Sequence, residues 1–187
     1  MTRYTLNLVF PQQWLLMFTM CLLFTGSKVQ ADSVIYEYQV KATFLFYFGK
    51  FIKYPTVAFK DAQSEMNICV LGDDPFQGSL DTLVKGETTQ DRPIKIRYLQ
   101  KVDEALGCHT LFISTSEQAK LSYILAQVKQ RPVLTVSDIR DFVTRGGMIE
   151  FYRMENKIRF FIEPTTAIEA GLKISARLLQ LSNVLKK

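Results

Sequence analysis

The chain has 187 residues, of which 23 are basic and 18 acidic, giving a formal net charge of +5 at pH 7. Two of the basic residues, Arg3 and Lys28, fall in an N-terminal segment that we expect to be removed, so the remainder is close to neutral. Since no run of five lysines or arginines occurs either, the composition argues against a nucleic-acid partner.

The first 31 residues have the pattern of a secretory signal. Arg3 supplies the positive charge, and Trp14–Thr25 is an apolar run too short to span a bilayer as a permanent helix. Val29-Gln30-Ala31 offers small residues for cleavage, so we predict a signal peptide over 1–31 and a single mature domain over 32–187. The alternative is an uncleaved membrane anchor.

The first predicted element of the mature chain is a helix over residues 34–54, ended by Pro55. Its apolar residues recur at helical spacing, which predicts a stripe that faces the core. The stripe consists of Val40, Phe44, Tyr47, Phe48 and Phe51.

Short apolar strands then alternate with segments that begin at helix-capping residues. The predicted strands cover residues 67–71, 94–99, 108–113 and 133–136. The predicted helices start at Asp74-Pro75, span 102–106 and 116–129, and follow Ser137-Asp138 as far as residue 143. This alternation predicts an α/β fold with a mostly parallel sheet and helices on both faces, a Rossmann-like three-layer sandwich.

The pattern changes near the C-terminus. Residues 148–153 and 157–162 flank the turn Met154-Glu155-Asn156, which predicts an antiparallel hairpin. Pro164 begins a predicted C-terminal helix that runs to about residue 185. The residues expected to face the sheet are Gly171, Ile174, Leu178, Leu181 and Leu185.

Two cysteines remain after the predicted cleavage, Cys69 and Cys108. In an exported protein a disulfide is the default state of such a pair, and it would close a loop of about 40 residues. In the chain-entropy model this closure stabilises the fold by roughly 4 kcal/mol. The alternative is a pair of buried free thiols.

Polar residues follow three of the predicted strands at their carboxyl ends. Asp73 and Asp74 come after the first strand, Ser114 after the third and Ser137 after the fourth. Because ligands of open parallel sheets bind beyond the carboxyl ends of the strands, these four residues form a candidate pocket for a small ligand or cation. The alternative is that they cap the helices that follow, since caps require the same residue types.

The sequence carries no motif that predicts catalysis. His109, the single histidine, lies inside a predicted strand, where a packed, hydrogen-bonded role is expected. There is no Gly-x-Ser-x-Gly, no His-Glu-x-x-His and no glycine-rich phosphate loop. One histidine and a bonded cysteine pair leave too few ligands for zinc, so we expect no enzyme, no cofactor and no metal.

The first predicted helix holds more aromatic residues than one buried stripe can accommodate. Tyr38 and Phe46 lie off the stripe, and with Tyr36 they form a candidate partner surface, because exposed aromatic residues favour protein–protein contacts. The alternative is that the helix lies between the sheet and a neighbouring element.

Eight stretches, in the same order along the chain, resemble the YfiR-like periplasmic repressor family from about Gln39 to Val184. They are VKATFLFYFGKFIKYP (40–55), ICVLGDDPF (68–76), RPIKIRYL (92–99), CHTLFIS (108–114), ILAQVKQRPVLTVSD (124–138), GGMIEF (146–151), IRFFIE (158–163) and AGLKISARLLQLSNV (170–184).

The resemblance implies a binding role in the periplasm. YfiR-like proteins repress the periplasmic sensor domain of an inner-membrane diguanylate cyclase, which lowers cyclic-di-GMP and affects biofilm behaviour. The resemblance also implies a disulfide between Cys69 and Cys108, an outer-membrane partner that can sequester the repressor, and a homodimer. The competing hypothesis is a periplasmic small-molecule sensor or solute-binding module that uses the pocket of Asp73, Asp74, Ser114 and Ser137.

Overall fold

The computed structural model describes the backbone of residues 27–184 and the side chains of residues 33–183. Most of the predicted signal peptide lies outside the described residues, so cleavage after Ala31 stays a prediction. The chain divides into one unit up to Tyr36 and a compact unit from Glu37 onward. Among residues 27–184, no helix combines the length and the apolar character that a membrane-spanning segment needs.

Helix α2 (Ser27–Phe51) starts seven residues before the predicted helix and ends three residues earlier. In the compact unit its most buried apolar side chains are Ala42, Leu45, Phe46 and Phe48. The predicted stripe is therefore only partly right: Phe48 is fully buried, whereas Tyr47 keeps 46% of its surface exposed. The helix is followed directly by strand β1 (Ile52–Lys53), which pairs antiparallel with β9 (Lys173–Ile174).

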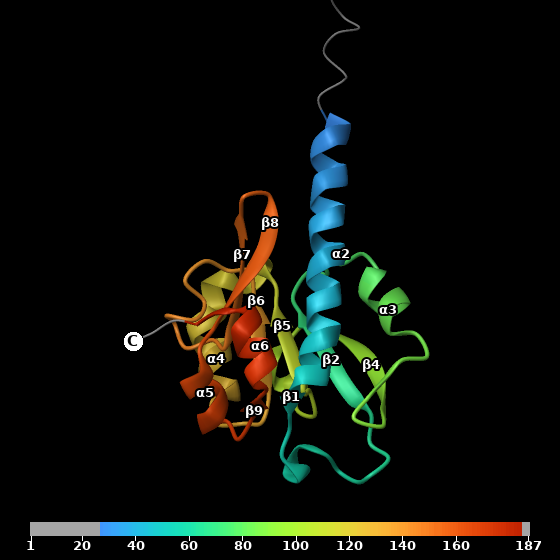
Figure 1. Ribbon diagram of the computed structural model, residues 1–187, viewed down its shortest axis with the longest axis vertical. Coiled ribbons are helices and arrows are strands. Elements are labelled where there is room, and N and C mark those ends of the chain that lie inside the picture. The colour runs from blue at the N-terminus through green and yellow to red at the C-terminus, as the bar shows by residue number, and fades with distance from the viewer. Residues whose placement is uncertain (1–26, 185–187) are drawn as a thin grey trace, which may run out of the picture. The chain divides into compact units, whose positions relative to one another are not determined.

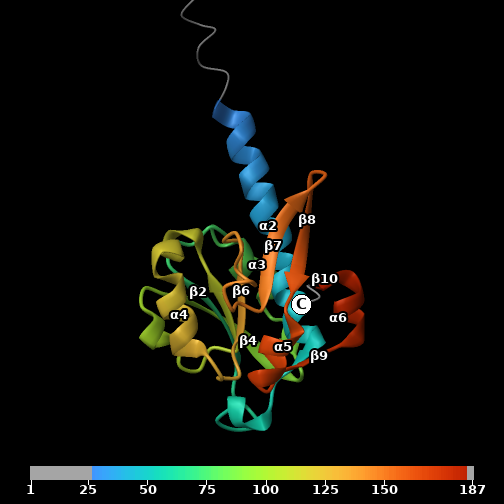
Figure 2. The ribbon, with the colours of Figure 1, turned by 90° about the vertical axis from the view of Figure 1, so that its left-hand side faces the viewer.

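The main sheet has eight strands in the order β10-β8-β7-β6-β5-β2-β4-β3 (Figures 1 and 2). Strands β4, β2, β5, β6 and β7 are parallel, and β8 returns antiparallel to β7. The strand bounds are β2 (Met66–Leu71), β3 (Thr88–Thr89), β4 (Arg92–Leu99), β5 (Thr110–Ile113), β6 (Leu134–Ser137), β7 (Ile149–Met154), β8 (Lys157–Ile162) and β10 (Asn183–Val184).

The strand order refines the predicted fold class. The mixed α/β class, the mostly parallel sheet and the antiparallel hairpin are confirmed. Numbered along the chain, the five parallel strands run 2-1-3-4-5, which is the flavodoxin-like order rather than the order of the Rossmann dinucleotide-binding fold. The Rossmann-like part of the prediction is therefore not confirmed.

Alternate residues of the central strands pack against different elements on the two faces of the sheet. Ile68 and Val70 of β2 pack with α2, with α3 (Ser79–Val84) and with buried residues near the C-terminus. Cys69 and Leu71 pack with the 3-10 helix η3 (Val102–Ala105) and with α4 (Leu121–Val128). The sheet is thus covered on both faces, as its near-continuous apolar strands require.

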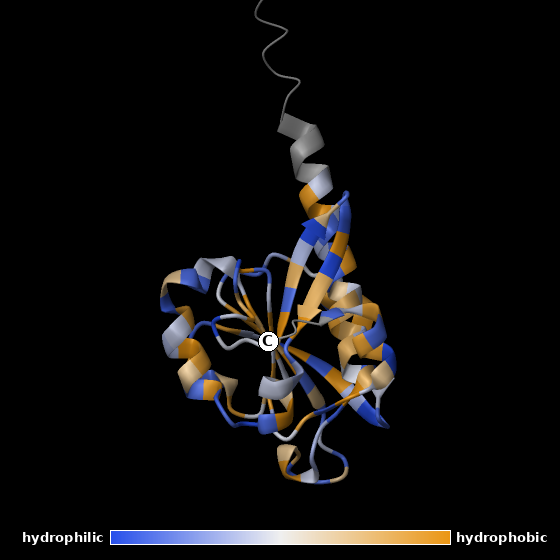
Figure 3. Cartoon of the chain, turned by 60° about the vertical axis from the view of Figure 1, so that its left-hand side comes forward, coloured by the Kyte–Doolittle hydropathy of each residue, from blue (hydrophilic) through white to orange (hydrophobic). Residues whose placement is uncertain are grey.

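The hairpin turn is built by two residues in the left-handed region. Glu155 and Asn156 have φ values of +49° and +60°, the backbone of a type I′ turn that matches the twist of paired strands. Figure 3 shows hydrophilic residues gathering toward the tip of this hairpin, while its base joins the core through Ile149, Phe151 and Phe160.

The predicted C-terminal helix is wrong as a single element. The chain forms α5 (Pro164–Glu169), β9 and α6 (Ala176–Leu181) instead. Gly171 takes a φ of +77°, which ends α5, and the Ser175 side chain accepts a hydrogen bond from the Leu178 N–H to start α6. Because the axis changes at these residues, Leu178 is buried but Leu181 is exposed.

Two other helix predictions are also corrected. No helix begins at Pro75: Asp74 accepts a hydrogen bond from the Phe76 N–H, which makes a turn, and α3 begins later at Ser79. The residues after Ser137 form turns up to Gly147 rather than a short helix. Gly147 is needed there, since a Cβ at this position would lie 2.1 Å from the buried Phe142 ring.

Candidate functional site

The carboxyl edge of the sheet brings together the loops that the sequence marked as a pocket. Strands β2, β5 and β6 are parallel neighbours, so the loops that follow them meet at one edge. The Asp73 N–H donates to Ser116 Oγ at 3.0 Å across the first two loops. Gly72 has a φ of +90°, and a Cβ there would lie 2.4 Å from Ser116 Oγ. The loop after β5 therefore packs tightly on the loop after β2.

The four predicted pocket residues lie in or next to these loops, and the side chains of Asp74 and Ser137 form hydrogen bonds with the backbone. Ser137 is buried, and its hydroxyl donates to the Ile113 carbonyl at 2.6 Å and accepts from the Ile139 N–H at 3.0 Å. Ser114 is buried too, whereas Asp73 and Asp74 are exposed. None of the four lines the surface hollows beside α4, beside His109, between α2 and α3, or at α5, so the pocket stays a prediction.

An ion cluster built around the buried pair of Lys41 and Asp138 lies at this same edge and was not predicted. Lys41 on α2 places Nζ 2.6 Å from Asp138 Oδ2 and 2.6 Å from Glu37 Oε1. The Lys41 side chain is 4% exposed and the Asp138 side chain 9%. Arg153 on the hairpin lies 3.7 Å from the second oxygen of Glu37. We call these four residues, together with Tyr38, the carboxyl-edge cluster.

Tyr38 links the aromatic side of α2 to this cluster. Its hydroxyl donates to Asp138 Oδ2 at 2.8 Å, and its ring packs edge-on against Phe76 at 5.6 Å. Burial, followed by the negative charge of Asp138, raises the pKa of the Tyr38 hydroxyl well above its usual range. The hydroxyl therefore stays a donor at physiological pH.

Asp138 depends on Lys41 for charge compensation. Its other oxygen, Oδ1, is buried and has no hydrogen-bond partner within the described part of the chain. A buried carboxylate with one oxygen unsatisfied is costly, and the ammonium of Lys41 is the closest opposite charge. The cluster therefore joins α2, the loop after β6 and strand β7 at a single point.

The three residues of the predicted partner surface have different environments. Phe46 is 6% exposed, so its assignment to the surface is wrong. Phe46 belongs to the same buried apolar cluster as Leu80 and Val84 of α3, as the alternative of a helix covered by a neighbouring element expects. Tyr38 is half-buried in the cluster. Tyr36 is 69% exposed and remains available for contact.

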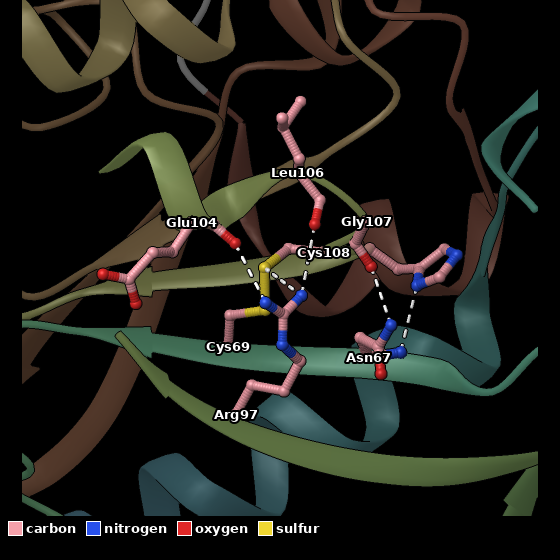
Figure 4. The surroundings of a disulfide bond; sticks show 8 residues. Asn67, Cys69, Arg97, Glu104, Leu106, Gly107 and Cys108 are labelled. Atoms are coloured by element: carbon pink, nitrogen blue, oxygen red, sulfur yellow. Dashed lines mark hydrogen bonds between the residues drawn. A yellow bond between two sulfur atoms is a disulfide. The ribbon is translucent and has the colours of Figure 1, made fainter. Parts of the chain in front are cut away.

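The predicted disulfide is confirmed: Cys69 on β2 is bonded to Cys108, just before β5, with Cα atoms 5.9 Å apart (Figure 4). Arg97 on β4 lies beside the bond and donates to the Leu106 and Glu104 carbonyls at 3.2 and 3.0 Å. On the other side, the side-chain amide of Asn67 donates to the Gly107 carbonyl at 2.8 Å. The turn before Cys108 is therefore held from two neighbouring strands.

His109 has the packed role that the sequence predicts. Its Nδ1 accepts a hydrogen bond from the Asn67 N–H at 3.0 Å, so Nε2 carries the proton and donates to the Ala58 carbonyl at 3.1 Å. The ring stacks on Phe59 with centroids 4.4 Å apart. Burial lowers the pKa of His109 from its ordinary 6.5 to about 4, and the charge of Arg92 acts in the same direction.

All of these residues except Tyr36 and Glu37 lie within the span of one family model. The model of the YfiR/HmsC-like family matches residues 38–183, nearly the whole compact unit. The chain belongs to the YfiR/HmsC-like family. No curated protein matches the chain.

In this YfiR/HmsC-like chain, sequence reasoning found the bonded cysteines and the packed histidine but missed the carboxyl-edge cluster. A signal for it was present, because a lysine at position 41 interrupts an otherwise apolar and aromatic helix face. Among the described residues, no group of three or more His, Cys, Asp or Glu side chains is arranged to hold a metal ion.

Proposed function

We propose that this protein is an exported regulator that binds the periplasmic sensor domain of an inner-membrane diguanylate cyclase and holds the enzyme inactive. The observation that carries the proposal is the YfiR/HmsC-like match over residues 38–183. The protein acts by binding and transforms no substrate. Its output is a lower cyclic-di-GMP concentration in the cytoplasm and reduced biofilm formation.

The physical requirement of such a repressor is differential affinity. A binding protein shifts a two-state cyclase toward its inactive state only if it binds that state more tightly. A framework tied by a disulfide between central strands and by a buried ion cluster supports this role, because a stiff surface loses little conformational entropy on binding. The disulfide also supports a periplasmic location, where cysteines oxidise readily.

Among the aromatic residues predicted for partner contact, Tyr36 is the one that the proposal retains. A large exposed tyrosine can supply an anchor with only two side-chain torsions to fix. The proposal also retains an outer-membrane partner that competes for the repressor, and self-association into a homodimer.

The decisive experiment tests whether the effect on cyclic-di-GMP requires export of the protein. The gene is deleted and then restored either as the full chain or as residues 32–187 behind a start methionine, and cyclic-di-GMP is measured in each strain. Deletion should raise the nucleotide several-fold. The full chain should restore it, and the leaderless chain, confined to the cytoplasm, should not.

Capture of partners completes the test. The tagged full chain is crosslinked in intact cells and recovered, and the leaderless chain serves as the matched control. Recovery of a membrane diguanylate cyclase with the full chain alone supports the proposal. An unchanged cyclic-di-GMP level in the deletion strain, together with recovery of no cyclase, would contradict it.

A further inference from the structure

Strand β8 is covered by a neighbour along only part of its outer edge. β10 pairs with β8 at Phe161 and Ile162, so residues 157–160 have no strand on that side within the described part of the chain. This stretch belongs to the hairpin of β7 and β8, which projects beyond the other strands of the sheet (Figures 1 and 2). We call residues 157–160 the free edge of β8.

The hydrogen bonds of the hairpin determine which backbone groups of the free edge point outward. The Glu163 N–H donates to the Met148 carbonyl at 2.8 Å, so the odd-numbered residues of β8 direct their N–H and C=O groups toward β7. Ile158 and Phe160, which alternate with them, direct theirs to the outer edge. The N–H and C=O of Ile158 and the N–H of Phe160 therefore have no strand to bind and are left to water.

The free edge also has two cations on one face of the sheet. Lys157 and Arg159 are two residues apart, so their side chains point to the same face. Both are exposed, and neither forms an ion pair among the described residues. Tyr152 of β7 lies opposite Arg159 and stacks on Phe161 with ring centroids 4.3 Å apart, which adds aromatic surface to this face.

A second copy of this chain is a poor partner for the free edge. Antiparallel pairing of two such edges about a two-fold axis must bring outward-facing residues, Ile158 or Phe160, against each other. The residues between them then place Lys157 opposite Arg159 of the second copy, or Arg159 opposite its own equivalent. Like charges directly opposite each other destabilise paired strands. The free edge therefore favours a strand that has negative charge.

We propose that the free edge of β8 binds an acidic, extended segment of a partner protein, which joins the sheet as a further strand. The backbone of the segment completes the hydrogen bonds at Ile158 and Phe160. Carboxylates at every second residue of the segment lie beside Lys157 and Arg159, as cross-strand neighbours of opposite charge do in stable sheets.

A folded acidic surface fits the free edge less well, because it can meet the two cations but cannot pair with the backbone groups. The inference concerns the mode of docking and applies to any protein that supplies such a segment. It therefore does not depend on the proposed repression of a cyclase.

The test uses the purified mature chain, residues 32–187, and NMR of its backbone amides. Without a peptide, the Ile158 amide should exchange with solvent at least about tenfold faster than the Arg159 amide, which faces β7. The probe is N-acetyl-Thr-Glu-Val-Glu-Val-Thr amide, and the control peptide has lysine in place of both glutamates. The acidic peptide should shift the amides of residues 157–160 and slow exchange at Ile158, whereas the lysine peptide should have little effect.

Two pairs of variants separate the backbone contribution from the charge contribution. Ile158→Pro removes an outward N–H that β7 does not use, a position where edge strands tolerate proline, and should weaken peptide binding at least about tenfold. Ile158→Ala loses the same side chain but keeps the N–H, so it should still bind. Arg159→Gln should weaken binding about threefold, as loss of one exposed ion pair does, and Arg131→Gln in the exposed turn after α4 should not change it.

Four results would overturn the proposal, provided that the spectra show a folded chain. They are no response of residues 157–160 to the acidic peptide, an equal response to the lysine peptide, and equal binding by Ile158→Pro and Ile158→Ala. The fourth is exchange at Ile158 that slows with protein concentration alone, which would assign the edge to a second copy. Absence of peptide binding with undisturbed cyclase capture would reject this inference alone, and the reverse result would reject only the proposed function.

Discussion

Lys41 is a charged side chain that the fold has removed from water. Its ammonium lies between the carboxylates of Asp138 and Glu37 at 2.6 Å from each. A lysine on an aromatic helix face is visible in the sequence, but its partner Asp138 is 97 residues away. Propensity and periodicity describe one element at a time, so they cannot predict a pair that exists only when α2 packs beside the end of β6.

Replacing Lys41 by methionine should lower the free energy of unfolding by about 3–5 kcal/mol, because the Asp138 carboxylate would be left buried without its counter-ion. Urea unfolding at pH 7 measures the change. The matched control is Lys50→Met on the same helix, whose exposed pair with Glu87 at 3.7 Å should cost less than about 1 kcal/mol.

A double variant separates lost charge pairing from lost packing. Asp138→Leu added to Lys41→Met removes the stranded carboxylate, so it should recover part of the lost stability. If the double variant were no more stable than Lys41→Met alone, the cluster would not act through charge compensation.

His109 should make stability depend on pH. Its pKa is about 4 in the fold against the ordinary 6.5, so the unfolded chain binds the proton first as the pH falls. The contribution of His109 to stability should be constant above about pH 7 and decline as the pH falls from about 6.5 to 4. Below about pH 4 this residue should cause no further loss. Between pH 7.5 and 5.0 the expected loss is about 2 kcal/mol.

Urea midpoints across this range measure the effect of His109. The His109→Gln variant keeps an acceptor for the Asn67 N–H and a donor for the Ala58 carbonyl but does not titrate. Its stability should therefore vary much less between pH 7.5 and 5.0. An equal decline in both proteins would show that other groups cause the pH dependence.

At the scale of elements, strands were predicted better than helices. Runs such as residues 67–71 and 133–136 are short, apolar and bounded by turn residues, and each corresponds to a strand of the sheet. Helix continuity depends on single residues: Pro164 and the leucines after it favour one helix, yet Gly171 at φ +77° and the cap at Ser175 divide it. Such a backbone conformation is set by packing, which periodicity does not report.

The candidate pocket stays a prediction for a related reason. Residues that cap or turn the chain have the same chemistry as residues that bind ligands. Ser137 illustrates this, since its hydroxyl donates to the Ile113 carbonyl of β5 and accepts from the Ile139 N–H in the loop that follows β6.

The disulfide acts on two elements at once, because it ties β2 to the residues just before β5. Replacing both Cys69 and Cys108 by alanine should lower the free energy of unfolding by up to about 4 kcal/mol, mainly through the larger entropy of the unfolded chain. Guanidinium unfolding of the variant, of the oxidised protein and of the protein with a reductant measures this. A loss below about 1 kcal/mol would mean that the bond is not a main source of stability.

At the scale of the whole molecule, two exposed tyrosines allow a test of the partner surface. Tyr36 on α2 and Tyr123 on α4 are 69% and 56% exposed. If Tyr36 anchors the cyclase sensor, Tyr36→Ser should reduce capture of the cyclase at least tenfold, as loss of an interface tyrosine commonly does. Tyr123→Ser should not change it. Capture is quantified after crosslinking in intact cells, and equal recovery with both variants would exclude Tyr36 as an anchor.

The link between Cys69 and Cys108 also has a consequence for proteolysis. The exposed turn at Lys85-Gly86 lies between the two cysteines, so a protease that cuts there breaks the backbone but releases no fragment. Both pieces should migrate as one band on a gel until a thiol is added. A nicked molecule therefore keeps its two pieces covalently joined, because Cys69 lies in one piece and Cys108 in the other.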